Sequence, residues 1–137
     1  MNTWTNKLKP TLIEQLHETE ALWHLAVTGG GTSAIGELFA VAGASTTILD
    51  VQVPYHESAL QRFLKTSQSQ GCNTTTARAM AVESFLRAKE LMPGKQVFGL
   101  GCTAAIATQR DRKGQDRCYL AVQSEKRTCS ADLIFEK

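Results

Sequence analysis

The sequence predicts an α/β fold with three layers, α/β/α, around a mixed, mostly parallel sheet of about five strands. Two observations support this fold class. Apolar runs typical of buried strands alternate with segments of helical periodicity, which is the pattern of parallel sheets. The last two predicted strands follow each other directly and should pair antiparallel. The 137 residues are predicted to form a single domain, with residues 1–20 as an N-terminal tail and helix.

The elements of the first half follow from periodicity and from helix and strand breakers. Pro10 is tolerated in the first turn of a helix, Gly43 is a natural left-handed residue after a helix, and Pro54 stops a strand. The elements predicted on this basis are a helix over 10–18, a strand over 22–27, a helix over 32–41 and a strand over 46–53.

The second half continues the alternation and then ends in strands. A stripe of small and apolar residues over 74–92 predicts a long helix packed closely on the sheet, and Pro93-Gly94 ends it. Residues 101–116 are rich in Thr, Arg, Asp and Gly and predict a loop. The remaining predicted elements are a short helix opening at residues 55–57 and strands over 96–100, 118–122 and 130–135.

The composition of the chain argues against several classes of function. Fifteen Lys and Arg against 13 Asp and Glu give a net charge of +2, which is too balanced for wrapping a nucleic acid or binding a membrane surface. The four cysteines form no C-x-x-C pair and the three histidines have no metal-ligand spacing, so neither a metal nor another cofactor is expected. No apolar run suggests a signal peptide or a membrane span, and we expect a cytoplasmic protein with free thiols.

Three consecutive glycines lie between the first predicted strand and the helix that follows it. A backbone without Cβ atoms can turn so that amide groups at a helix N-terminus point at an anion. We therefore expect a phosphate or carboxylate to bind at Gly29, Gly30, Gly31, Thr32 and Ser33. A ligand-free turn is one alternative. A dinucleotide site is another, because Gly29-x-Gly31-x-x-Ala34 and Asp50 fit a relaxed fingerprint, although the apolar pattern continues past Asp50.

The segment from Ala26 to Ala59 resembles the C-terminal domain of the CinA (competence-damage-inducible) family, which includes nicotinamide mononucleotide deamidases. Members show motifs of the types A-E-S-C-T-G-G, A-G-S-S or A-G-A-S, and Y-S-N-E-x-K. Residues 26–31 (AVTGGG), 42–45 (AGAS) and 55–60 (YHESAL) match them without gaps, and 99–106 (GLGCTAAI) is similar to a later G-x-x-G-I-A-G-P loop. The resemblance implies the three-layer fold, a nucleotide substrate, and hydrolysis of its carboxamide to an acid and ammonia without a metal.

The resemblance also implies catalytic roles, and this sequence departs from them. The family uses a serine nucleophile, a lysine base and a nearby tyrosine. Thr28 stands at the serine position and Tyr55 at the tyrosine position, whereas Leu60 replaces the lysine and cannot take a proton. His56 is a candidate base because imidazole titrates near neutral pH.

Further candidates lie later in the chain. Thr103 can offer a hydroxyl, and Arg110 and Arg112 can contact a phosphate or carboxylate, unless their loop is simply a solvated run of charges. Three functions are compatible with these residues: a ligand-binding domain that does not hydrolyse its ligand, an amidohydrolase with a rearranged catalytic set, and a non-catalytic regulatory or interaction module. We expect the first, since the glycines, Thr28 and Tyr55 are kept while the base is missing.

The expected partners are a small nucleotide-like ligand and a second copy of the chain. Family domains continue past the last strand into a further helix, whereas this sequence stops at Lys137, shortly after Phe135. We therefore expect an extended apolar patch on one face of the sheet, covered in a homodimer or by another part of a longer multidomain chain.

Overall fold

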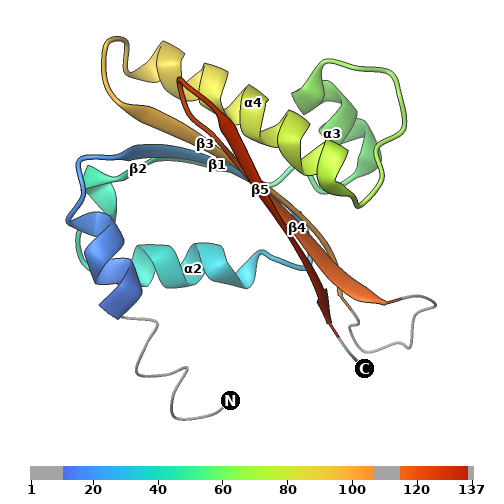
Figure 1. The fold of residues 1–137 in the computed structure, drawn as a ribbon, viewed down its shortest axis with the longest axis horizontal. Helices are drawn as coiled ribbons and strands as arrows, with labels where there is room; N and C mark the ends of the chain where they lie inside the picture. The colour runs from blue at the N-terminus through green and yellow to red at the C-terminus, as the bar shows by residue number, and fades with distance from the viewer. Residues whose placement is uncertain (1–10, 107–114, 136–137) are drawn as a thin grey trace.

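The structure is a computed structural model that describes residues 11–106 and 115–135. At its centre lies a five-stranded sheet in the order β2-β1-β3-β4-β5 (Figure 1). β1 pairs in parallel with β2 and β3, whereas β4 is antiparallel to both β3 and β5. Of the five strands, only β4 runs in the opposite direction, which confirms the mixed, mostly parallel sheet. The strands are β1 (Leu22–Gly29), β2 (Ile48–Gln52), β3 (Val97–Ala105), β4 (Asp116–Gln123) and β5 (Thr128–Phe135).

Helices cover both faces of the sheet, which confirms the three layers. Two of them, α3 (Glu57–Leu64) and α4 (Thr74–Leu91), lie on one face. The opposite face carries α2 (Ser33–Ala40) and helical residues 11–17 (Figure 1). In the described ranges, no helix has the length and apolar composition needed to cross a bilayer.

The predicted close packing of α4 on the sheet is confirmed at β3. A Cβ atom on Gly101 would lie 2.2 Å from the carbonyl oxygen of Ala77, and one on Gly99 would lie 2.2 Å from the amide nitrogen of Phe85. Real side chains cannot sit at these distances, so the two glycines allow the backbone of α4 to approach the strand directly. This approach fixes the position of α4 above β1 and β3.

The structure corrects one sequence prediction, the loop over 101–116. Its first residues, 101–105, continue β3, which pairs with β1 on one side and with β4 on the other along this stretch. Glycine and alanine are weak strand formers, so the segment resembles a loop when it is read alone. Pairing on both edges overrides that local preference and carries Thr103 into the centre of the sheet.

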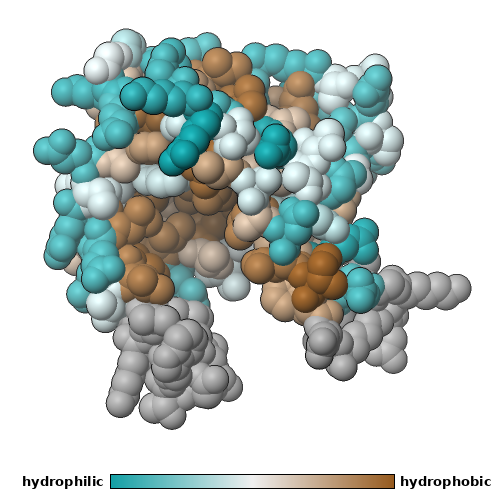
Figure 2. Space-filling view, in the orientation of Figure 1, coloured by the Kyte–Doolittle hydropathy of each residue, from teal (hydrophilic) through white to brown (hydrophobic). Residues whose placement is uncertain are grey.

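The face opposite α3 and α4 is only partly covered. An apolar cavity of about 260 Å³ separates α2 from β1, β3 and β4, and Figure 2 shows hydrophobic side chains lining a hollow in this region. Leu133 and Phe135 on β5 are 44% and 42% exposed. The expected apolar patch is therefore present, and its covering by a second copy stays a prediction.

Candidate functional site

The candidate site lies where the parallel strands β1 and β3 end. Thr28 pairs with Thr103 across these strands, and parallel partners in register place their side chains on the same face. Ala26, two residues before Thr28, packs against Leu60 of α3 and Met80 of α4, so the alternation turns Thr28 toward the same helices. Thr28 is 6% exposed and Thr103 4%. The structure thus brings together two of the residues expected from the sequence, as adjacent buried hydroxyls.

The glycine turn follows directly and passes around the end of β3. Gly29 has φ +85°, and a Cβ atom there would lie 1.9 Å from the carbonyl oxygen of Ala104. Gly30 donates its N–H to that same oxygen at 3.2 Å, so its amide is already occupied. At Gly31 a Cβ atom would lie 3.1 Å from Cys102 Sγ, on the α2 side of the sheet. The turn therefore carries the chain from the face of Thr28 to the α2 layer.

The amides that remain available lie at the start of α2. Thr32 precedes the helix and its side chain makes no capping hydrogen bond. Within the described residues, no acceptor contacts the N–H groups of Gly31, Thr32 and Ser33. Unpaired amides at a helix N-terminus favour a negatively charged partner. This end of α2 can accept an anion, whereas Gly30 cannot donate to one without losing its bond to Ala104.

The connection from β2 to α3 supplies Tyr55 and His56. Tyr55 is 72% exposed, so it is not a core residue, and no hydrogen bond joins it to Thr28 among the described residues. His56 precedes α3, and its Nδ1 accepts a hydrogen bond from the amide of Ser58 at 3.1 Å. This is the geometry of a helix cap. The lone pair that a general base would use is therefore engaged in this contact.

Leu60 fills the position where the family resemblance implies a lysine. It is buried and packs with Ala26, Phe63 and Met80, on the face to which Thr28 also points. The position is thus oriented toward the threonine, but its side chain is inert. Arg110 and Arg112, the remaining expected ligand contacts, lie outside the described residues.

Comparisons with known proteins agree on the fold. No protein-family model and no curated protein matches the sequence. Solved structures do match. A CinA superfamily protein from Escherichia coli aligns with a TM-score of 0.72 at 16% identity, covering 95% of this chain and 76% of its own. One from Enterobacter cloacae aligns with a TM-score of 0.65 at 15% identity, covering 95% and 78%. The chain has the fold of the CinA superfamily. A competence/damage inducible protein from Agrobacterium tumefaciens gives a TM-score of 0.56 at 16% identity, covering 92% and 78%.

On this CinA fold the chain carries a polar pair, one member of which is buried, that the sequence did not reveal. His24 on β1 is fully buried, and its Nε2 lies 3.3 Å from Oδ2 of Asp50 on β2. Neither ring nitrogen makes a well-aligned hydrogen bond. Asp50 is in the middle of its strand, so it does not take the strand-end place that a dinucleotide site requires. A titratable residue in each of two apolar runs was the signal available in the sequence.

The described residues give no sign of a metal centre. In the ranges 11–106 and 115–135, no group of three or more His, Cys, Asp or Glu side chains is placed to hold an ion. Cys102, which lines the apolar cavity, has a thiol whose pKa burial raises to about 12, with Cys118 acting in the same direction. Such a thiol stays protonated at neutral pH and is a poor nucleophile.

The buried His24 predicts a pH-dependent stability. Burial lowers the pKa of its imidazole from the ordinary 6.5, Asp50 opposes this shift, Arg87 adds to it, and Glu83 opposes it. As the pH falls through 6.5, the unfolded chain takes up a proton that the folded chain does not. The free energy of unfolding should therefore decrease over this range.

Urea unfolding between pH 8 and pH 5 measures this dependence. His24→Gln should reduce the decrease, whereas His56→Gln, which alters an exposed histidine, should leave it largely intact. An NMR titration of the His24 imidazole in the unmodified protein gives the same test without a substitution. A midpoint at or above 6.5 would refute the expectation.

Proposed function

We propose that this domain is similar to nicotinamide mononucleotide deamidases in its site but binds its ligand without hydrolysing it. The ligand is a nucleotide or another small anion, held at the turn over residues 29–33. The observation that supports this proposal best is the juxtaposition at the ends of β1 and β3. There the buried hydroxyls of Thr28 and Thr103 adjoin a turn that leads to the unpaired amides of α2.

The arrangement of the helices favours an anion at this edge. Each of α2 and α3 follows a parallel strand and runs back across the sheet, so its N-terminus lies near the ends of β1 and β2 (Figure 1). α4 precedes β3 and runs antiparallel to it, which places its N-terminus at the same edge. Helix N-termini carry partial positive charge. Their convergence attracts a negative group without a cluster of basic side chains, in keeping with the balanced charge of the chain.

The absence of hydrolysis follows from the missing base. Attack by a hydroxyl requires a group that removes its proton. Leu60 cannot do this, and the Nδ1 lone pair of His56 is engaged with the amide of Ser58. Loss of general-base catalysis alone lowers a rate by about 10²- to 10⁴-fold. We therefore favour binding over an amidohydrolase with a rearranged catalytic set.

Titration with nicotinamide mononucleotide tests the proposal. Thermal unfolding should shift upward with ligand concentration, while an ammonia assay on the same samples stays at background. Thr28→Val keeps the shape of the side chain and removes the hydroxyl, and it should weaken binding by up to about tenfold. Thr75→Ala, at an exposed position of α4, is the matched control and should have no effect.

The possible outcomes distinguish the three candidate functions. Binding without ammonia supports the proposal. Ammonia release that is lost in Thr28→Val would instead show an active amidohydrolase. Neither binding nor ammonia would contradict the proposal and leave a regulatory or interaction module.

A further inference from the structure

A second groove lies away from the glycine turn, between β2, α3 and α4. It has a volume of about 380 Å³. Its polar lining consists of the side chains of Gln52, Arg62 and Arg87, and Phe63 also lines it, with its ring against the Arg87 guanidinium. Val53, Pro54 and Ala59 form an apolar wall. Neither aspartate nor glutamate contributes to this lining, so both charged groups that face the groove are cationic.

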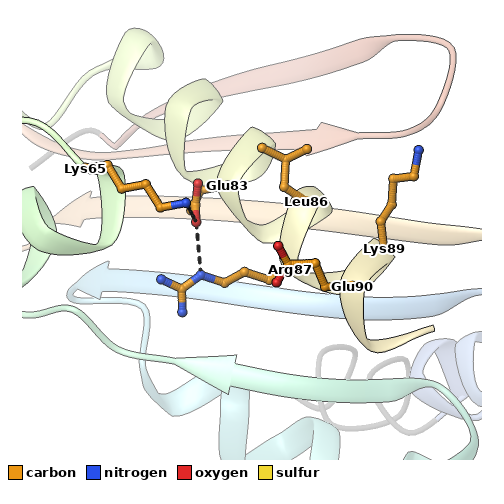
Figure 3. A pocket seen from close by; sticks show the side chains of 6 residues that line it. All are labelled: Lys65, Glu83, Leu86, Arg87, Lys89 and Glu90. Atoms are coloured by element: carbon orange, nitrogen blue, oxygen red, sulfur yellow. Dashed lines mark hydrogen bonds and ion pairs between the residues drawn. The ribbon is translucent and has the colours of Figure 1, made fainter. Parts of the chain in front are cut away.

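Arg87 is held in place and still has donors to offer. Its guanidinium lies 4.4 Å from the centre of the Phe63 ring, and its Nε pairs with Glu83 Oε1 at 3.2 Å. Figure 3 shows the two Nη atoms of Arg87 pointing away from that carboxylate. No described acceptor contacts these two atoms. A guanidinium fixed through Nε and its flat face is preorganised to bind an anion through its Nη groups.

The surroundings leave an excess of positive charge. Glu83 pairs with Arg87 and also with Lys65, whose Nζ lies 3.4 Å from Oε1 (Figure 3). One carboxylate therefore balances two cations. Arg62 adds a further guanidinium that pairs with no carboxylate among the described residues. Asp50, which accepts a hydrogen bond from Gln52 at 3.3 Å, is a second carboxylate beside the groove. Three cations therefore face two carboxylates, and the local charge remains positive, close to +1.

We propose that this groove binds a phosphate monoester. The positive local charge attracts a phosphate group, and the forked donors of arginine fit phosphate oxygens. The organic part of the ligand lies against Val53, Pro54 and Ala59, which gives the ester an advantage over inorganic phosphate. The site is formed by β2, α3 and α4 and shares no residue with the turn at 29–33, so it is independent of the proposed function.

Calorimetric titration with phenyl phosphate, inorganic phosphate and benzoate tests the assignment. Phenyl phosphate should bind saturably and more tightly than inorganic phosphate, and benzoate should bind more weakly than phenyl phosphate. Loss of one charge-assisted arginine contact should weaken phenyl phosphate binding by about ten- to a hundredfold. Arg62→Gln removes an exposed cation. Arg87→Lys removes the forked donors of the guanidinium but keeps a positive charge next to Glu83, so it should weaken binding without unfolding the domain.

Two controls locate the binding. Arg78→Gln alters an exposed arginine on the same helix, which donates to Ser130, and should leave the affinity unchanged. Thr28→Val is the second control, because phenyl phosphate binding that is lost in this variant and kept in both arginine variants would belong to the turn over residues 29–33 and overturn the assignment. The proposal is overturned if phenyl phosphate does not bind saturably, if benzoate binds equally well, or if Arg62→Gln and Arg87→Lys weaken binding no more than Arg78→Gln does.

Discussion

Replacing Gly101 with valine should leave the domain largely unfolded. Even the first carbon of the new side chain would lie 2.2 Å from the carbonyl oxygen of Ala77 and 2.7 Å from the amide nitrogen of Ala81. These are backbone atoms of α4 and cannot move aside without displacing the helix from the sheet. Overpacking costs about 1–3 kcal/mol where flexible side chains can yield, and more where they cannot. Domains of this size have only about 5–15 kcal/mol of stability in total.

Chemical denaturation measures this effect, with Gly101→Ala as the graded variant. Gly36→Ala in α2 is the matched control, since no atom lies within 4 Å of the added carbon. Alanine is a better helix former than glycine, so the control should raise the free energy of unfolding by about 0.5–1 kcal/mol. Similar unfolding midpoints for the two alanine variants would contradict the close packing of α4 on β3.

Combining Thr28→Ser with Leu60→Lys should create amidase activity. Leu60 contacts Ala26, which precedes Thr28 by about 7 Å along the same face of β1. The long lysine side chain can span that distance. Burial at this position should lower the pKa of the new amine and leave it able to take a proton at neutral pH. Ammonia release from nicotinamide mononucleotide should rise by about 10²- to 10⁴-fold over Thr28→Ser alone.

The control for this gain is Thr28→Ser combined with Leu60→Met. Methionine has a similar length to lysine and no basic group, and its packing cost should be small. It should give no increase in ammonia release. A folded lysine variant that binds the ligand and still shows no gain would mean that position 60 cannot serve a base at Thr28.

The fold could be predicted because local and long-range preferences agree along most of the chain. The apolar run of β1 is favourable in the centre of the sheet. The small residues along α4 are favourable where the helix packs closely on β3. The exception is the stretch over 101–105, where glycine and alanine suggest a loop and pairing on both edges makes a strand. This difference matters for the candidate site, because the stretch places Thr103 beside Thr28.

The candidate site could be predicted only where its residues are close in sequence. Thr28 and the glycine turn form one continuous motif, and Leu60 was found through its spacing in a known pattern. The pair of His24 and Asp50, and the groove shared by Arg62 and Arg87, join residues from separate elements. No sequence spacing marks such pairs, because they depend on which strands and helices become neighbours. The occupied amide of Gly30 likewise depends on where β3 ends.

Mapping amide chemical shifts during a titration with nicotinamide mononucleotide shows whether the turn over residues 29–33 binds an anion. Because nicotinamide mononucleotide is a phosphate monoester, the titration uses Arg62→Gln, in which the second groove is weakened. We expect saturable shifts concentrated at Gly31, Thr32 and Ser33, with smaller ones at Thr28 and Thr103. No ammonia should appear in the same tube. Saturable shifts confined to other parts of the sheet, or no saturable shifts at any ligand concentration tested, would contradict an anion site at the end of β1.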